Sequence, residues 1–274
     1  MSLKLLQKFG VVEFVGSPII GKRRFGVPVG GAFDLESFAL ANALVGNPVE
    51  TAIWELGMAQ ATFRSDYSGS VAIVGGIAEV LKDGSSLATN SAFGVFSGEE
   101  FTVKVPSAGA RTYLAWNPIV RAEGWIRRLT EPPSSVLARG QLRVVTGPQG
   151  DQFDLGLLSQ EYSVSRTINR VGVRFNESIG AHRIELPSEP QCVGTIQVSN
   201  DGTPIIIGPD GPTIGGYPKI AVVISSDLSR VAQLMPGASV LMELVSLEAA
   251  RAINAETRSL LELRVAMLSL GSQM

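Results

Sequence analysis

The sequence predicts a mainly antiparallel β protein. Its apolar segments are mostly short, rich in β-branched residues and separated by Gly, Pro, Asn or Asp, which is the pattern of strands joined by turns. The chain has 30 glycines and 15 prolines to supply those turns. With 274 residues it is long enough for two domains of ordinary size.

Strand candidates occur along the whole chain. Asp83-Gly84 and Asp201-Gly202 each lie between apolar runs, where an Asp-Gly pair suits the left-handed backbone of a tight hairpin. The clearest strand segments are Val11–Val15, Ser70–Val74, Phe101–Val105, Gln141–Val145, Thr195–Val198, Pro204–Ile207 and Ile220–Ile224.

Two helices are expected against this background. The first spans about Leu35–Val45, with Asp34 placed to cap its free N–H groups and Gly46 placed to end it. The second spans about Leu247–Leu270, with Ser246 as its cap. We expect the second helix to pack on its own domain through an apolar side made of Ile253, Leu260, Leu261, Leu263 and Leu268.

A domain boundary is expected in the middle of the chain. The segment Glu131-Pro132-Pro133-Ser134-Ser135 lies between two β-rich regions, and such Pro/Ser clusters are typical of linkers. The sequence therefore predicts an N-terminal domain over residues 1–131 and a C-terminal domain over 132–274 that includes the terminal helix.

Composition argues against several classes of partner. The net charge of −2 gives no electrostatic reason to expect a nucleic acid or an anionic membrane. No stretch approaches the roughly 20 apolar residues of a membrane span. Residues 1–9 contain Lys4 and Lys8 but no long apolar run, so we expect no signal peptide and a cytoplasmic protein.

Metal and disulfide chemistry is limited by a single histidine, His182, and a single cysteine, Cys192. An internal disulfide needs two cysteines, and a zinc site needs several such ligands, so no metal site is expected. The two residues would form a nucleophile and its base if the fold brought them together. The expected roles are instead a loop histidine and a buried thiol.

One apparent motif is rejected. Residues 16–22 match the spacing of a phosphate loop, but Arg23 stands where Ser or Thr should bind magnesium. Pro28 and the nearby glycines also oppose the helix that such a loop must begin. If ATP is used, this segment is not expected to bind it.

The first candidate binding segment is Gly26–Asp34. Its glycines allow close approach of a ligand to backbone N–H groups, and it leads into a helix N-terminus that favours anions. Arg23 and Arg24 precede it and are suited to pairing with a carboxylate or phosphate. The alternative is an ordinary strand-to-helix connection with exposed arginines.

The second candidate is Asp210–Pro218, where Gly215 and Gly216 permit close approach. Asp210, Thr213 and Tyr217 add three different polar groups, suited to positioning a nucleophile or polarising a carbonyl. The alternative is a long turn between strands.

The third candidate is Ser165–Gly172. Asn169 and Arg170 place a planar amide beside a guanidinium, which suits carboxylate or ureido groups. Surface arginines are common, so an exposed turn is the alternative.

Several of these segments, taken in order, resemble one family: allophanate hydrolase subunit 2, also called the C subunit of 5-oxoprolinase. The same family corresponds to half of the carboxyltransferase region of urea carboxylase. The resemblance rests on the residues Arg24–Asp34, Ala41–Asn47, Gly98–Glu100, Gly109–Ala115, Asn169–Gly172, Gly194–Val198, Asp201–Gly202, Pro204–Ile205 and Gly215–Ala221.

The resemblance implies two tandem cyclophilin-like β-barrel domains with a few short helices. It implies one component of a heteromeric amidohydrolase, ATP-dependent 5-oxoprolinase, with a site shared with subunit 1 (the B subunit of 5-oxoprolinase) and with the A subunit as a further partner. Alternatives are carboxyl transfer to a ureido or amide substrate, and a regulatory binding protein without catalysis. The chain has no biotin-acceptor Met-Lys-Met, so bound biotin is not expected.

One departure bears on activity. Family members continue after the Tyr-Leu-Ala element with Gly-Gly-Ile and a Ser-Arg-Ser-Thr segment, whereas Trp116-Asn117-Pro118 follows Ala115 here. If that segment lines the active site, part of the site is lost or rebuilt in this chain. With that reservation, Arg170, Asp210 and Tyr217 are the expected catalytic residues, and the expected substrate-binding residues are Arg24, Asn169, Thr213, Gly215 and Gly216.

Overall fold

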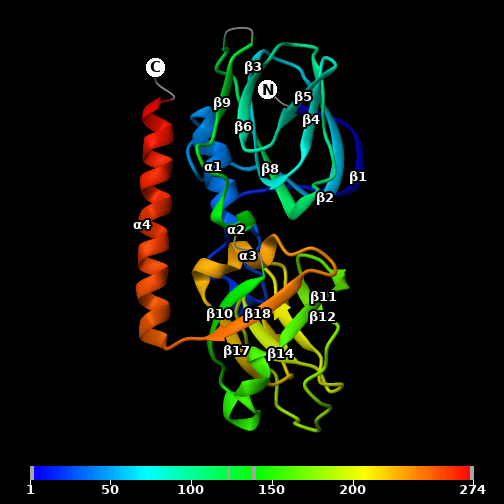
Figure 1. Cartoon of the computed structure of the whole chain (residues 1–274), viewed down its shortest axis with the longest axis vertical. Helices are drawn as coiled ribbons and strands as arrows, with labels where there is room; N and C mark the ends of the chain where they lie inside the picture. The colour runs from blue at the N-terminus through cyan, green and yellow to red at the C-terminus, as the bar shows by residue number, and fades with distance from the viewer. Residues whose placement is uncertain (1–2, 122–123, 138–139, 272–274) are drawn as a thin grey trace. The chain divides into compact units, whose positions relative to one another are not determined.

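The computed structural model describes residues 3–121, 124–137 and 140–271, and it confirms the mainly β fold class (Figure 1). The described chain forms two compact units built from interleaved segments. The first unit comprises Met1–Ser17, Asp34–Leu137 and Leu260–Met274, and the second comprises Pro18–Phe33 and Ala138–Ser259. The division into domains 1–131 and 132–274 stays a prediction.

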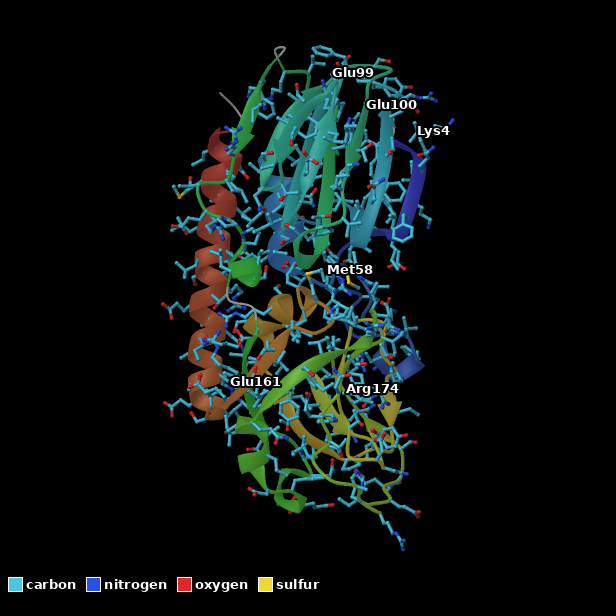
Figure 2. The ribbon with its side chains drawn as sticks, turned by 45° about the vertical axis from the view of Figure 1, so that its right-hand side comes forward. Lys4, Met58, Glu99, Glu100, Glu161 and Arg174 are labelled. Atoms are coloured by element: carbon cyan, nitrogen blue, oxygen red, sulfur yellow. The ribbon has the colours of Figure 1, made fainter. Side chains whose placement is uncertain are left out.

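The first unit is an open sheet of nine strands in the order β5-β4-β7-β2-β8-β3-β6-β9, with β1 also paired to β2. Lys4 of β1 and Glu100 of β7 both pair with Arg64, on opposite edges of β2 (Figure 2). The strands are β1 Leu3–Val15, β2 Ile53–Ser65, β3 Gly69–Ile77, β4 Glu79–Lys82, β5 Ser85–Ala88, β6 Ser91–Val95, β7 Glu100–Val103, β8 Ala108–Asn117 and β9 Ile126–Arg128.

Local sequence signals account for much of this sheet. Side chains alternate between buried and less buried along the second half of β2, which packs a core that includes Phe63, Phe93 and Phe101. The β4–β5 hairpin turns at Asp83 and Gly84, whose φ angles are 49° and 74°. Both are left-handed, as a two-residue hairpin turn requires, which confirms the prediction for Asp83-Gly84. At Asp201-Gly202 the prediction of a tight hairpin is wrong: Gly202 has a φ of 83° but Asp201 has no positive φ, because residues 199–203 separate the paired residues Val198 and Pro204.

The second unit is a closed barrel of seven strands in the order β10-β17-β14-β15-β12-β11-β18. Its core is formed by buried aliphatic and aromatic side chains, among them Tyr162, Phe175 and Phe33. A separate two-stranded ribbon pairs β13 with β16. The strands are β10 Gln141–Thr146, β11 Glu161–Ile168, β12 Gly172–Phe175, β13 Glu189–Pro190, β14 Thr195–Val198, β15 Pro204–Ile207, β16 Ile214–Gly215, β17 Lys219–Val223 and β18 Ser239–Leu244.

Of the longer helices, α1 (Leu35–Val45) has the predicted ends. The Asp34 carboxylate accepts a hydrogen bond from the Ser37 N–H at 3.0 Å, and Gly46 ends the helix with a φ of 80°. The Asn42 amide donates to the carbonyls of Thr51 and Val49, as expected for a buried polar group. The shorter helices are η1 Arg23–Phe25, α2 Ser134–Leu137, η2 Gly150–Gln152, η3 Leu155–Ser159, η4 Ser225–Asp227 and α3 Leu228–Ala232.

The C-terminal helix α4 (Leu247–Gly271) is capped by Ser246, whose hydroxyl accepts from the Ala249 N–H. Its expected apolar side is only partly right, because Leu260 and Leu263 are 55% and 57% exposed. The face that carries Arg264 is anchored instead, through an ion pair to Glu36 at 2.8 Å. Among the described residues, no helix is both long enough and apolar enough to span a membrane.

Candidate functional site

Three segments from distant parts of the sequence meet in the second unit, and each belongs to a different candidate segment. The turn at 169–171 precedes β12, and the turn at 208–211 follows β15. Because β12 and β15 are antiparallel neighbours, with Gly172 opposite Ile207, these turns lie at the same end of the barrel. Residues 30–31 join them: the Gly30 N–H donates to the Pro209 carbonyl at 2.9 Å.

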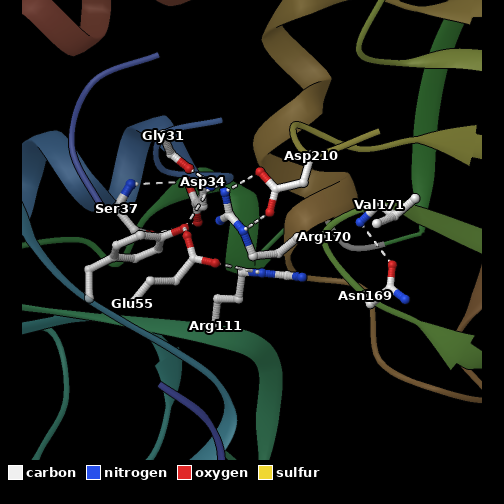
Figure 3. Close-up of polar contacts among 10 residues, drawn as sticks. Gly31, Asp34, Ser37, Glu55, Arg111, Asn169, Arg170, Val171 and Asp210 are labelled. Atoms are coloured by element: carbon white, nitrogen blue, oxygen red, sulfur yellow. Dashed lines mark hydrogen bonds and ion pairs between the residues drawn. The ribbon is translucent and has the colours of Figure 1, made fainter. Parts of the chain in front are cut away.

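Arg170 is the centre of this cluster (Figure 3). Its Nε and Nη2 donate to the two carboxylate oxygens of Asp210 at 2.7 and 3.0 Å, and Nη2 also donates to the Gly31 carbonyl at 2.6 Å. The Arg170 side chain is 9% exposed and that of Asp210 is 38% exposed. The guanidinium is therefore committed to holding Asp210 and the glycine segment, while the carboxylate keeps a face toward solvent.

Glycines make this close approach possible. Gly30 and Gly31 have φ angles of 57° and 71°, a conformation that other residues adopt only with strain. At Gly208, a Cβ atom would lie 2.2 Å from the Arg170 carbonyl oxygen. That same carbonyl accepts the Asp210 N–H at 3.1 Å, so backbone and side chain both fix Asp210 beside Arg170.

Asn169 lies next to this pair and is exposed. Its Oδ1 accepts the N–H groups of Val171 and Gly172 at 2.8 and 3.2 Å, which caps its own turn. Its Nδ2 has no partner among the described residues, so it remains free to donate to a ligand oxygen.

The remaining candidates in the second segment form the turn that ends at β17. Gly215 pairs with Glu189, and Tyr217 is 39% exposed. The Thr213 carbonyl accepts the Gln191 N–H at 3.1 Å. Lys219 was not among the predicted site residues. Its ammonium group donates to the Glu189 carboxylate at 3.1 Å and to the Tyr217 carbonyl at 3.4 Å.

The two arginines before the glycine segment differ sharply. Arg23 donates through Nη2 to the backbone carbonyls of Gln191 and Pro212, so it anchors its segment to the second unit. Arg24 is exposed and stacks on the ring of Phe25, with 4.8 Å between its Cζ atom and the ring centre. No described contact joins Arg24 to Arg170 or Asp210.

Two buried polar atoms near this anchor have no hydrogen-bond partner among the described residues. They are Nη1 of Arg23, a donor, and Oε1 of Gln191, an acceptor. An unsatisfied buried polar group costs about 1–3 kcal/mol, so an ordered water or a ligand atom is expected there.

The first unit contains a second polar network, all of it buried. Tyr113 accepts the Asp34 N–H at 2.8 Å and donates to Glu55 at 2.6 Å, and Arg111 Nε donates to the same carboxylate at 3.2 Å. Burial, together with the nearby Glu55 carboxylate, raises the pKa of Tyr113 well above its usual value. The phenol therefore stays protonated and acts as a fixed donor.

This network fixes the start of α1. The Asp34 carboxylate also accepts hydrogen bonds from the hydroxyls of Ser37 and Ser135, at 2.7 and 2.8 Å. The sequence showed Asp34 as a cap at the end of the glycine segment and included Arg111 and Tyr113 in the family resemblance without a role, and it did not single out Glu55. The sequence signal that could have revealed this network is the presence of charged and phenolic residues at core-facing positions of β2 and β8, where Glu55 pairs with Tyr113.

His182 and Cys192 have separate local contacts. The His182 ring contacts the Val198 carbonyl and accepts the Ile184 N–H, each at 3.2 Å. The Cys192 thiol lies 3.4 Å from the Thr195 hydroxyl and is exposed, not buried as expected. Across the described ranges, no group of three or more His, Cys, Asp or Glu residues is arranged to hold a metal ion.

A cavity of about 380 Å³ lies elsewhere in the second unit, between β10, β18 and α3. Its two arginines, Arg143 and Arg230, are engaged by Asp227, which is fully buried. None of the predicted site residues lines this cavity. We place the candidate site at Arg170 and Asp210 because three independent segments converge there on an exposed carboxylate.

Several known proteins are similar to this chain. The carboxyltransferase domain, subdomain A and B, matches residues 25–125 and 117–244. The chain is 28% identical to the 5-oxoprolinase C subunit of Escherichia coli (strain K12) over 271 residues, covering 84% of this chain and 87% of the relative. It is 26% identical to urea amidolyase of Lachancea kluyveri, covering 85% of this chain but only 16% of that protein.

A solved structure of K. lactis urea amidolyase has the same fold. The TM-score is 0.81 at 22% sequence identity, and the match covers 96% of this chain and 20% of that chain. This chain therefore spans most of the length of a 5-oxoprolinase C subunit but only a small part of a urea amidolyase.

Proposed function

The chain belongs to the carboxyltransferase-domain family, and on that premise we propose that it is one component of an ATP-dependent amide-hydrolysing enzyme, with 5-oxoproline as substrate and glutamate as product. The observation that carries the proposal is the similarity to the C subunit of 5-oxoprolinase along most of both chains. The partners are then the B and A subunits of that enzyme, and the complex acts in the cytoplasm.

The chemistry of the candidate site suits an amide. An amide or ureido group presents an N–H donor and a carbonyl acceptor side by side. The half-exposed Asp210 carboxylate is the acceptor for the substrate N–H. The free Asn169 Nδ2 and the Tyr217 hydroxyl are donors for its carbonyl oxygen, where negative charge develops during attack. Arg170 keeps Asp210 in place. We assign the turn 213–217 and Arg24 to substrate binding at the same site.

ATP is assigned to a partner protein of the complex. Residues 16–22 run into the three-residue η1, so this chain offers no helix N-terminus there to receive phosphates. The segment does not fit a nucleotide, and the ATP-dependent step belongs to another component. Biotin is not assigned to this chain, because the sequence has no acceptor Met-Lys-Met.

Carboxyl transfer is the second candidate function. The match of this chain to the carboxyltransferase domain and its similarity to urea amidolyase favour it. Carboxybiotin would then arrive as a substrate on another domain, and activity would be blocked by avidin.

Reconstitution tests the proposal. This chain is co-purified with the B and A subunits from its own organism, and ATP hydrolysis is measured with and without 5-oxoproline. We expect 5-oxoproline-dependent turnover only in the complete mixture, and insensitivity to avidin. A stable complex of all three proteins that hydrolyses no ATP with 5-oxoproline would contradict the proposal, and avidin-sensitive activity with urea would establish the second candidate instead.

A further inference from the structure

Lys219, the first residue of β17, is the only buried lysine among the residues that the structure describes. Its side chain is 3% exposed. Removing an ammonium group from water is costly unless charged and polar partners replace the water. The surroundings of Lys219 must therefore supply those partners.

Three acceptors surround the ammonium. Nζ lies 3.1 Å from the Glu189 carboxylate, 3.4 Å from the Tyr217 carbonyl and 3.5 Å from the Gly215 carbonyl. An ammonium has three N–H groups, so each has an acceptor here and none is left for a substrate. Lys219 is therefore unsuited to direct catalysis.

Glu189 is itself held in position. The Gln149 side-chain amide donates a hydrogen bond to the Glu189 carboxylate at 3.2 Å. Its oxygen accepts the backbone N–H of Lys219 at 3.0 Å. The Glu189 side chain is 37% exposed, so it connects this buried cluster with the surface. Lys219 thereby links three separate segments: 149, 189 and 215–217.

The turn at 215–217 is held at its flanks by the Thr213 and Pro218 carbonyls, which accept the Gln191 and Val198 N–H groups at 3.1 and 2.9 Å, but the turn itself has few other restraints. The ribbon that begins it has two residue pairs, Glu189 with Gly215 and Pro190 with Ile214. So short a ribbon is not stable by itself. Gly215 and Gly216 add no side-chain packing and have the largest backbone freedom to lose. The two carbonyls that face Nζ supply the missing restraint.

We propose that Lys219 is a positioning residue that fixes the Gly215–Tyr217 turn and so sets where the Tyr217 side chain is presented to the substrate. Its effect on turnover rests on the function proposed above, whereas its effect on the turn does not. Hydrogen exchange and kinetics separate the two.

The first arm measures amide hydrogen exchange of the full-length chain by mass spectrometry. Lys219→Met keeps the length of the side chain and removes its charge. We expect exchange in residues 213–217 to become at least about tenfold faster, with the α1 peptide unchanged. Lys8→Met, on the exposed part of β1 and without a described side-chain contact, is the matched control and should change neither region.

Glu189→Gln is a second, milder variant for the same exchange measurement, and it tests the proposal if Lys219→Met does not fold. It leaves the ammonium and both carbonyl acceptors in place and alters a half-exposed side chain. We expect a smaller acceleration, about threefold, confined to the same residues. Unchanged exchange at 213–217 in whichever of the two variants folds would overturn the proposal.

The second arm measures 5-oxoproline-dependent ATP hydrolysis by the complete complex. A turn that is competent only part of the time reduces the apparent affinity for substrate by that fraction. We expect the competent fraction to fall to about one tenth in Lys219→Met, so that KM rises about tenfold while kcat changes less than about twofold. Loss of folded protein would instead lower kcat alone. A faster-exchanging turn with unchanged KM would refute the link to the substrate, and an inactive wild-type complex would refute the proposed function while leaving the exchange result valid.

Discussion

Replacing Arg170 with methionine is expected to destabilise the chain and to release Asp210. The substitution keeps most of the aliphatic side chain and removes two hydrogen bonds to Asp210 and one to the Gly31 carbonyl, at 2.7, 3.0 and 2.6 Å. Hydrogen bonds to charged groups contribute about 1.5–3 kcal/mol each when buried. Water replaces part of this at Asp210, which is 38% exposed, so we expect a total loss of about 2–3 kcal/mol.

The assay is urea denaturation followed by circular dichroism, with the free energy of unfolding extrapolated to water. Arg174→Met is the matched control, because the one contact described for the Arg174 side chain is a 3.8 Å ion pair with Asp201, and the two side chains are 37% and 64% exposed. Exposed pairs contribute about 0–1 kcal/mol. If the two variants differ by less than about 0.5 kcal/mol, Arg170 does not hold the cluster together and the reasoning fails.

Three further outcomes are expected. Tyr113→Phe removes the hydroxyl that donates to the buried Glu55 carboxylate and accepts the Asp34 N–H, and it should lower the free energy of unfolding by about 2–3 kcal/mol in urea denaturation; an unchanged midpoint would contradict this. Arg143→Met removes the bidentate partner of the fully buried Asp227 and should cost about 3–5 kcal/mol by the same measurement, with no loss arguing against a charged Asp227. Hydrogen bonds from its own turn lower the pKa of Asp201 to about 2, below its ordinary value of 3.8. Its contribution to stability is therefore present above about pH 4 and lost as the pH falls toward about 2, and Asp201→Asn should flatten the stability profile in that window in an acid titration.

Local signals in the sequence were sufficient for several of the individual elements. The first helix begins after Asp34 and ends before Gly46 because both residues satisfy or terminate backbone hydrogen bonds locally. The strands Thr195–Val198 and Pro204–Ile207 have the predicted ends, and residues 199–203, which include Asp201 and Gly202, connect them.

The assembly of these elements could not be read from local patterns. Residues 18–33 join the second unit, although the sequence places them among strands of the first. The strand order depends on pairing between distant segments, which short-range periodicity does not encode. The exposed leucines of α4 show the same limit, since apolar spacing does not say which face is covered.

The candidate site was predicted in pieces. Local sequence motifs identified the glycine segment, Asn169-Arg170 and Asp210 separately, because glycine pairs and adjacent polar groups can be recognised in a sequence. Their convergence follows from the pairing of β12 with β15, which only the fold provides. Lys219 was missed because a single lysine before an apolar strand has the sequence pattern of a surface residue.

The central claim is that Asp210, held by Arg170, serves catalysis within a heteromeric complex. It is tested most directly by 5-oxoproline-dependent ATP hydrolysis of the reconstituted complex with Asp210→Asn in this chain. Asp151→Asn, an exposed carboxylate of the second unit without described side-chain contacts, is the control. The account predicts that Asp210→Asn lowers kcat/KM at least about a hundredfold while the complex still assembles and Asp151→Asn has full activity. Equal activity of the two variants would contradict it.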